Sequence, residues 1–194
     1  FDSMCTAVSY RTKDHYFGRT LDLEYSFDER VVITPRNFHF KFNHINEIKN
    51  HYAIIGMATV VDNYPLYYDA VNEKGLCIAG LRFPDYCIYH EFCDDKDNLA
   101  SFELIPYILS NCKNVNEAKE LLENINITKD DFNGDFISTP LHWMISDKKE
   151  SIVVEQTKDG LRIYDNPVGV MTNNPTFDIQ LFEYAAVEAL LVAL

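Results

Sequence analysis

The order of the segments along the chain constrains its fold more than any single motif does. Residues 6–81 contain a series of segments rich in strand-forming residues, and two amphipathic helices are predicted between residues 101 and 125. Strand-like segments return after Gly134. Strands and helices that are segregated in this way favour an α+β domain, in which helices pack on the outer faces of antiparallel sheets. We therefore predict a single α+β domain over residues 1–194.

The strands predicted before the helices are separated by turns rich in Asn, Asp and Gly. They are expected at residues 6–10, 16–21, 30–35, 38–43, 52–61, 66–70 and 76–81. In the segment 38–43, three Phe residues alternate with polar residues, which predicts one buried face. The segment 52–61 is almost continuously apolar, as expected for a strand covered on both faces.

The first helix is expected at residues 101–110, where Pro106 either kinks the helix or occupies its first turn. The second begins after a cap at Asn114 or Asn116, and its apolar face extends to Ile125. Four more strands are then predicted at residues 141–146, 151–157, 161–164 and 169–172. The last residues, 183–194, have the composition of an apolar helix. Such a tail packs on the domain, mediates self-association, or is a frame-shifted or artificial segment.

Composition limits the classes of partner. With 30 acidic and 17 basic residues among 194, the formal charge is −13, which argues against a surface for nucleic acid or anionic membranes. No apolar run approaches the roughly 20 residues of a membrane span. The five cysteines include no CxxC pair, and no secretory signal precedes them, so we expect free thiols in a reducing cytoplasm.

Cys5 is the candidate nucleophile. If a hairpin turns near Thr12 and Lys13, Cys5 lies opposite Arg19 or Thr20, with Cβ atoms roughly 5 Å apart, and a guanidinium at that distance favours a thiolate. Asp22 is placed to accept a hydrogen bond from a terminal ammonium group. The alternative is a cysteine simply buried in the hairpin.

A free α-amine at Cys5 would also provide a base, because its ordinary pKa of about 8 is close to neutrality. This chemistry requires the removal of residues 1–4, since an acylated nitrogen cannot accept a proton.

Two other features are open to simpler interpretations. The aromatic segment 83–92 either lines an apolar pocket or packs against its own domain. Cys87, His90 and Cys93 have an unusual spacing for metal ligands, and we predict neither a metal nor a cofactor.

Several motifs in order resemble the choloylglycine hydrolases, which are the bile salt hydrolases and penicillin V acylases of the N-terminal nucleophile superfamily. The resemblance extends from Met4 to about Phe182. The motifs are Cys5-Thr6-Ala7, Phe17-Gly18-Arg19-Thr20-Leu21-Asp22, Ile33-Thr34-Pro35-Arg36-Asn37, Asp62-Asn63-Tyr64-Pro65, Asn72-Glu73-Lys74-Gly75-Leu76, Leu141-His142-Trp143, Ser151-Ile152-Val153-Val154-Glu155 and Thr172-Asn173-Asn174-Pro175-Thr176-Phe177-Asp178.

The resemblance implies a four-layer αββα sandwich with antiparallel sheets and hydrolysis of an amide by an N-terminal cysteine exposed after processing. It makes Cys5 the nucleophile and its own amine the base, with Arg19 and Asp22 beside it. Asn173 would donate a hydrogen bond to the developing oxyanion. Without the resemblance, Asn173 and its neighbour would be interpreted only as turn residues before a proline.

Substrate contacts are predicted from Arg82, Phe83, Tyr86 and Asn174. Arg82 departs from the family pattern, in which bile salt hydrolases typically have Asn and penicillin V acylases have Tyr. An Arg there is able to donate a hydrogen bond, to meet an anionic glycine or taurine tail, or to fill the pocket.

Two further departures concern the ends of the chain. Phe1-Asp2-Ser3 precedes the usual Met-Cys, as a short propeptide or tag would. Family members also continue well over a hundred residues further, with a second active-site arginine, so we expect the C-terminal part of the family fold to be missing. From Glu183 the resemblance ends.

The leading functional hypothesis is therefore a cysteine amidohydrolase of glycine- or taurine-conjugated bile salts, a small-molecule substrate. The alternatives are an acylase of penicillin V or acyl-homoserine lactones, and a catalytically inactive homologue with a binding or assembly role. The resemblance also implies a homotetramer.

Overall fold

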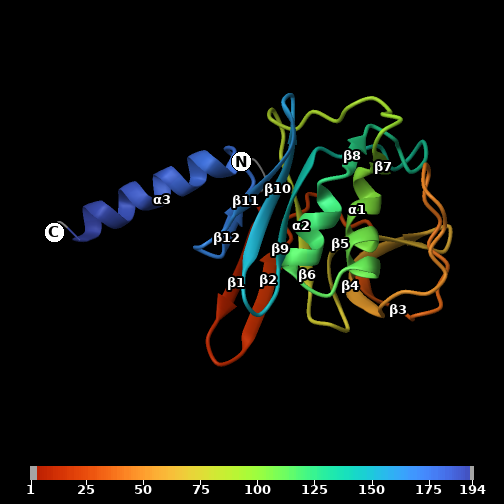
Figure 1. Ribbon diagram of the computed structural model, residues 1–194, viewed down its shortest axis with the longest axis horizontal. Helices are drawn as coiled ribbons and strands as arrows, with labels where there is room; N and C mark the ends of the chain where they lie inside the picture. The colour runs from red at the N-terminus through yellow and green to blue at the C-terminus, as the bar shows by residue number, and fades with distance from the viewer. Residues whose placement is uncertain (1–3, 193–194) are drawn as a thin grey trace.

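An antiparallel sheet of seven strands forms the centre of the computed structural model, which describes residues 4–192 (Figure 1). The strand order is β11-β10-β9-β6-β5-β4-β3, so two sequential hairpin systems meet where β6 pairs with β9. The strands are β3 Arg30–Thr34, β4 Ile54–Val61, β5 Tyr64–Asn72, β6 Cys77–Arg82, β9 Leu141–Ser146, β10 Ser151–Thr157 and β11 Gly160–Asp165.

A smaller antiparallel sheet of three strands, in the order β12-β1-β2, packs on one face of the large sheet. β1 (Thr6–Arg11) and β2 (His15–Thr20) form a hairpin, and β12 (Val170–Thr172) pairs with the other edge of β1. β1 alternates buried and exposed residues because only one of its faces meets the large sheet. The small sheet therefore brings residues near the two ends of the described chain together.

Two helices and a short parallel strand pair cover the opposite face of the large sheet. α1 (Leu104–Asn111) follows a 3₁₀ turn at Ser101–Glu103, and α2 is Val115–Leu122. They are flanked by β7 (Asp97–Ala100) and β8 (Ile125–Thr128). Pro106 lies in the first turn of α1, where its missing N–H breaks no helical hydrogen bond. Asn114 caps α2 by accepting a hydrogen bond from the backbone nitrogen of Glu117 at 3.0 Å.

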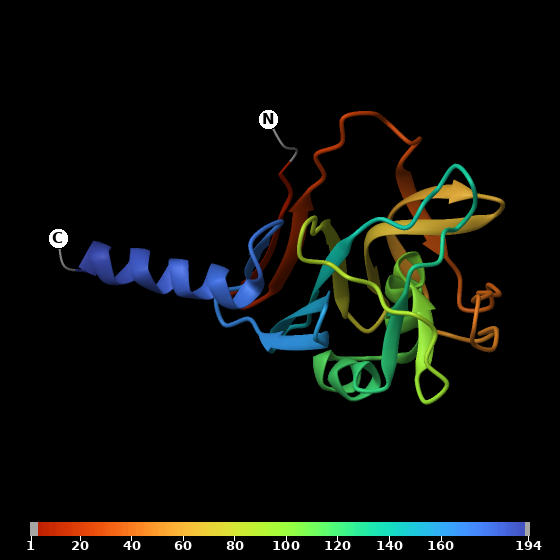
Figure 2. The same ribbon diagram turned by 90° about the horizontal axis from the view of Figure 1, so that it is seen from above.

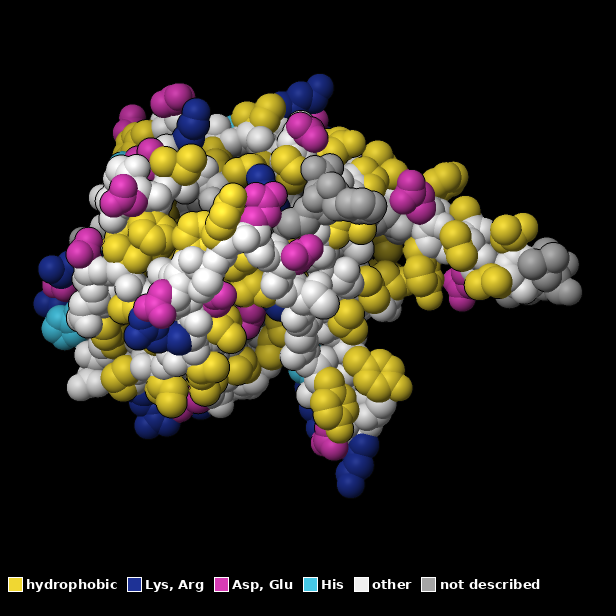
Figure 3. Space-filling view, turned by 180° about the vertical axis from the view of Figure 1, so that it is seen from behind, with side chains coloured by type: hydrophobic (Ala, Val, Ile, Leu, Met, Phe, Trp, Pro, Cys, Tyr) yellow, Lys and Arg dark blue, Asp and Glu magenta, His cyan; other side chains and the backbone are white. Residues whose placement is uncertain are grey.

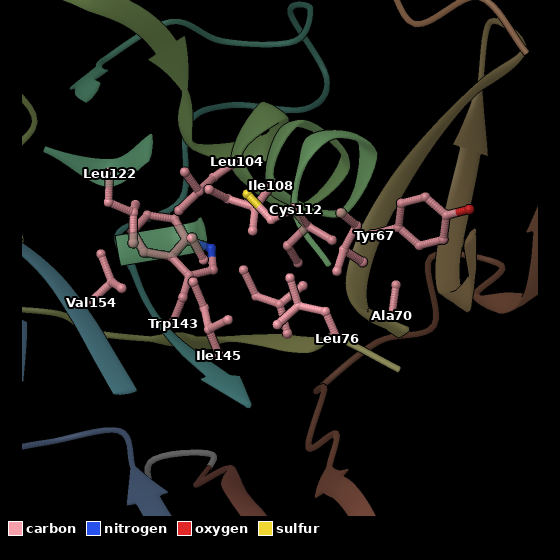
Figure 4. Close-up of a cluster of buried hydrophobic side chains, with 14 of the residues drawn as sticks. Tyr67, Ala70, Leu76, Leu104, Ile108, Cys112, Leu122, Trp143, Ile145 and Val154 are labelled. Atoms are coloured by element: carbon pink, nitrogen blue, oxygen red, sulfur yellow. The ribbon is translucent and has the colours of Figure 1, made fainter. Parts of the chain in front are cut away.

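The main core lies between these helices and the large sheet (Figure 4). Leu104 and Ile108 of α1 point toward Trp143 and Ile145 of β9, and all four side chains are fully buried. Burying one such side chain stabilises a fold by about 2 kcal/mol relative to exposure. This packing covers the face of the large sheet that is opposite the small sheet.

The last helix, α3 (Phe177–Val192), starts against the small sheet and then extends away from the domain (Figures 1 and 2). Phe177 is buried, but Phe182, Leu190 and Leu191 are exposed by 74%, 63% and 67%. Hydrophobic side chains therefore line the projecting helix (Figure 3). The helix predicted at residues 183–194 is confirmed as far as Val192; residues 193 and 194, and the predicted propeptide residues 1–3, lie outside the described part.

The α+β class with antiparallel sheets is confirmed, and the predicted strands 141–146 and 151–157 coincide with β9 and β10. The strand predicted at residues 38–43 is wrong: only Phe40 forms an isolated bridge, to Ile48. Phe38 and Phe40 instead pack edge-on at 5.0 Å in a cluster of aromatic rings, which buries the alternating face without a partner strand. β7 and β8 were not predicted, and the second predicted helix ends before Ile125, which begins β8.

The layers in the described residues are helix, large sheet and small sheet. The outer face of the small sheet carries exposed Val8, Tyr10 and Tyr16. No helix between residues 4 and 192 is long and apolar enough to cross a membrane.

Candidate active site

Cys5 directly precedes β1 and is buried, with 4% of its surface exposed. It belongs to a small apolar cluster between the two sheets. The buried members of the cluster are Cys5, Ala7, Ala79, Leu81, Met144, Val153, Met171 and Phe177. The thiol therefore lies at the edge of an apolar layer, next to the exposed Met4.

Asn173 contacts Cys5 because β12 is paired with β1. Thr6 is paired with Thr172, which places the residues just outside this pair, Cys5 and Asn173, side by side. The backbone nitrogen of Cys5 donates to Oδ1 of Asn173 at 2.5 Å. Nδ2 of Asn173 donates to the carbonyl oxygen of Arg82 at 2.7 Å. An amide nitrogen carries two hydrogens, so one donor of Asn173 is left for a further acceptor.

Asp22 binds the backbone nitrogen that precedes that of Cys5. Its Oδ2 accepts a hydrogen bond from the backbone nitrogen of Met4 at 3.1 Å. The side chains of Asp22 and Asn173 thus bind two successive backbone nitrogens, of Met4 and Cys5. A carboxylate in this position stabilises a positive charge on a nearby amine.

The predicted hairpin register is wrong, by one residue for the pairing of Cys5 with Thr20 and by two for the pairing with Arg19. Thr6 pairs with Thr20 and Ala7 with Arg19, so Cys5 lies beyond the paired residues and opposite neither Arg19 nor Thr20. The last pair of the hairpin is Arg11 with His15, so the turn has three residues, and within it the backbone nitrogen of Thr12 bonds to the carbonyl oxygen of Asp14. The hairpin itself and the proximity of its second strand to Cys5 are as predicted.

Arg19 is half-buried, and its guanidinium bonds to two backbone carbonyls, Gly80 through Nη1 at 2.9 Å and Thr20 through Nε at 3.1 Å. It also lines a cavity of about 180 Å³ together with Asp69. Burial raises the pKa of Asp69, and the positive charge of Arg19 opposes that rise. The Arg19 side chain therefore joins the small sheet to β6 of the large one.

The last residue of β6, Arg82, and the loop that follows it hold three of the predicted substrate-binding residues. Arg82 is exposed, and its carbonyl oxygen is the acceptor for Asn173. Phe83 is fully buried and stacks between His142, at 4.3 Å, and Tyr86, at 5.5 Å. Any ligand that meets this loop therefore reaches Tyr86, which is 37% exposed, before Phe83.

Asn174 is exposed and precedes Pro175 through a cis peptide bond. In the orientation that satisfies its neighbours, its side-chain nitrogen donates to the carbonyl oxygen of Pro84 at 3.2 Å. The structure thus brings Cys5, Asp22, Asn173, Asn174 and the Arg82 loop together, while Arg19 lies on the adjoining strand.

A buried pair behind the site was missed by the sequence interpretation. His142 of β9 and Glu155 of β10 are both fully buried, with Nδ1 of His142 3.2 Å from Oε1 of Glu155. Burial lowers the pKa of His142, and Glu155 only partly offsets this effect. The available signal was a glutamate directly after the apolar residues 152–154 of a predicted strand, because a charged residue is rarely buried without a reason.

A second, larger cavity of about 510 Å³ lies on the helix side of the large sheet, between β11 and β8, and is lined by His90 and Gln156 among others. Cys5 and Asn173 do not line either cavity. Across residues 4–192, no group of three or more His, Cys, Asp or Glu side chains is arranged to hold a metal ion.

The family described as linear amide C–N hydrolases, choloylglycine hydrolase family, matches residues 5–192. The chain belongs to the choloylglycine hydrolase family. The match begins at Cys5 and runs beyond Phe182, so it includes most of α3.

Curated relatives of the chain are named as bile salt or conjugated bile acid hydrolases. The bile salt hydrolase/transferase of Lactiplantibacillus plantarum is 51% identical over 92% of this chain and 55% of its own length. The conjugated bile acid hydrolase of Lactobacillus gasseri is 42% identical over 92% of this chain and 58% of its own length. The chain thus spans little more than half the length of the curated relatives it matches.

Solved structures agree with this assignment. A crystal structure of a variant of the conjugated bile acid hydrolase from Clostridium perfringens matches with a TM-score of 0.88 and 43% identity, over 94% of this chain and 57% of that one. Penicillin V acylase from Agrobacterium tumefaciens matches with a TM-score of 0.77 and 23% identity, over 94% of this chain and 56% of that one. The latter likeness concerns the fold alone. The N-terminal nucleophile hydrolase fold is therefore confirmed for the part of it that this chain covers.

Proposed function

We propose that the protein hydrolyses the amide bond of glycine- or taurine-conjugated bile salts, with Cys5 as the nucleophile. The observation that carries the proposal is the hydrogen bond from the Cys5 backbone nitrogen to Asn173, next to the bond from the Met4 nitrogen to Asp22. Membership of a family of linear amide hydrolases supports this proposal. In it, the Cys5 nitrogen bonded to Asn173 becomes the α-amine once residues 1–4 are removed, and Asp22, which bonds to the preceding nitrogen, stabilises positive charge on it.

The reaction follows from these positions. The α-amine of Cys5 takes the proton from its own thiol, and Sγ attacks the carbonyl carbon of the amide. The remaining N–H of the Asn173 side chain stabilises the oxyanion, a contribution of roughly 3 kcal/mol when such a donor is preorganised. The C–N bond then breaks, and the amine passes its proton to the leaving nitrogen. Water cleaves the thioester, which releases the acid and restores the thiol.

The choice of substrate rests on the names of relatives that are 42–51% identical. In this proposal, the exposed guanidinium of Arg82 meets the anionic tail of the conjugate, and Tyr86 and Asn174 lie beside the leaving group or the steroid. Arg19 holds β2 against β6 and keeps the site closed on that side. We also propose that the protein is cytoplasmic, because all five cysteines are unpaired. The family resemblance leads us to propose that it forms a homo-oligomer.

The test is an intact mass measurement before and after brief treatment with iodoacetamide, followed by turnover of a glycine-conjugated bile salt and of phenoxymethylpenicillin. Cys77 and Cys112 serve as internal controls, because burial raises the pKa of each thiol to about 12 and keeps it protonated. Loss of residues 1–4, selective alkylation of Cys5 and preferred turnover of the bile salt are expected. Retention of residues 1–4, with Cys5 as unreactive as Cys77, would leave a binding or assembly role instead. Preferred turnover of the penicillin would reassign the substrate.

A further inference from the structure

The buried His142–Glu155 pair is not used in the chemistry above, although an ionisable pair is costly to bury. Glu155 follows Val153 and Val154 along β10, and both members of the pair are fully buried. Oε2 of Glu155 has no hydrogen-bond partner among the described residues. Replacing a buried ionic pair with apolar residues is often neutral or stabilising, so stability alone does not account for it.

One contact of Glu155 reaches the segment that carries Asn173. Oε1 accepts a hydrogen bond from the backbone nitrogen of Phe177 at 2.9 Å, at the first residue of α3. Only three residues separate Phe177 from Asn173, and Thr172 fixes the other end of the segment in β12. The side chain of Gln180 adds a bond from Nε2 to the carbonyl oxygen of Pro175 at 2.7 Å. Glu155 therefore fixes the end of the segment nearest the helix.

The other contact of Glu155 reaches the acceptor of Asn173. His142, held by Oε1 of Glu155, stacks on Phe83 with an interplanar angle of 4°. Phe83 follows Arg82, whose carbonyl oxygen accepts from Nδ2 of Asn173. The two contacts of one carboxylate thus lead to the backbone that carries Asn173 and to the carbonyl that orients its amide.

We propose that Glu155, acting with His142, is a positioning residue that holds Asn173 against Cys5. The expected fall in kcat rests on the proposed function. The claim that Glu155 holds Asn173 in place rests on the contacts alone. Glu155 acts as a hydrogen-bond acceptor, so Gln, which keeps an oxygen at the same reach, replaces it in this role.

The chain offers a matched control at the next residue. Gln156 lies on the same strand, is 1% exposed and also has a side-chain oxygen without a partner in the described residues. It faces the 510 Å³ cavity on the opposite side of the sheet. Glu155→Leu and Gln156→Leu therefore remove a buried polar side chain from the same strand, and only the first touches the proposed support of Asn173.

In kinetics with a glycine-conjugated bile salt, Glu155→Leu is expected to lower kcat about 100-fold with KM within about threefold, as loss of a preorganised oxyanion donor does. Glu155→Gln should retain kcat within about tenfold, and Gln156→Leu should leave kcat unchanged. His142→Leu, which removes the stacking partner of Phe83, is a second disrupting variant in case Glu155→Leu does not fold. Equal losses of kcat in Glu155→Leu and Gln156→Leu would overturn the proposal.

A second readout does not depend on turnover. In a Cys5→Ala background that retains residues 1–4, hydrogen exchange of the backbone N–H at position 5 reports its bond to Asn173. Adding Glu155→Leu or His142→Leu should increase this exchange rate at least tenfold, whereas adding Gln156→Leu should not. If the wild type shows no turnover, the proposed function fails and exchange alone decides. Unchanged exchange at position 5 in both disrupting variants would refute the positional claim.

Discussion

Oδ1 of Asn173 lies 2.5 Å from the backbone nitrogen of Cys5, although 168 positions of sequence separate the two residues. The contact exists because β12 pairs with β1, and it ties the site to the edge of the small sheet. The same amide bonds to the carbonyl of Arg82 in the large sheet. One side chain thus joins the candidate nucleophile to both sheets.

Asn173→Ala removes both of these hydrogen bonds, and we expect kcat for a conjugated bile salt to fall by about 10²- to 10³-fold. Asn166→Ala is the matched control, since Asn166 is also buried and its side chain bonds to the backbone of Gly169 and of Val170, the first residue of β12, without contacting Cys5. Steady-state kinetics and thermal unfolding of both variants separate the effects. Similar kcat values for the two variants would contradict a role of Asn173 in the reaction.

The free energy of unfolding is expected to depend on pH through the buried carboxyl group of Glu103. Its carboxylate accepts bonds from the backbone nitrogens of Asn43 and Ala100, yet burial raises its pKa from 4.5 to about 7. The folded state then binds more protons than the unfolded state between these values, so the free energy of unfolding falls as pH rises through that window. The fall is at most about 3 kcal/mol. Urea unfolding from acid to neutral pH should show this slope in the wild type and lose it in Glu103→Gln.

Two strand glycines should respond oppositely to alanine. A Cβ at Gly56 of β4 would lie 2.1 Å from the carbonyl oxygen of Asp69, whereas a Cβ at Gly18 of β2 meets no atom within 4 Å. We expect Gly56→Ala to lower the free energy of unfolding by about 3 kcal/mol. Gly18→Ala should raise it by about 0.5 kcal/mol, because glycine is costly in a strand. Urea unfolding of the pair checks both signs, and a stable Gly56→Ala variant would show that β4 and β5 separate more easily than their packing indicates.

The exposed side chains of α3 predict self-association. Phe182, Leu190 and Leu191 lie on the projecting helix, and their replacement with Gln should reduce the sedimentation coefficient at high protein concentration. Because these side chains are exposed, the free energy of unfolding should change by less than about 0.5 kcal/mol. Sedimentation velocity and urea unfolding measure the two effects. A large loss of stability would mean that the helix packs on its own domain in solution.

Much of the fold could be predicted because its strongest segments are locally consistent. β9 and β10 are apolar runs bounded by turn residues, and the structure has them at the predicted residues. The segment 38–43 was misassigned because its alternating Phe residues pack as a cluster, and periodicity cannot show whether a partner strand is present. β7 and β8 are four-residue segments whose parallel pairing depends on distant contacts.

Some residues of the candidate site could also be predicted from the sequence, and others could not. Cys5 and Asp22 could be found from the first hairpin, and Asn173 only from the family resemblance. Glu155 could not be placed, because its contacts with His142 and Phe177 come from strand pairing and from the start of α3. The hairpin register was off by one or two residues because the length and centre of a turn cannot be determined from composition.

The pairing of β1 with β12 also determines when the site is assembled during synthesis. During synthesis the first strand leaves the ribosome with Cys5, but the strand that completes its sheet, with Thr172 opposite Thr6, is made last among the elements of the small sheet. Contacts between such distant segments form late in folding. Cys5 therefore meets Asn173 only after β12 has emerged, and the growing chain carries the candidate nucleophile without this partner until then.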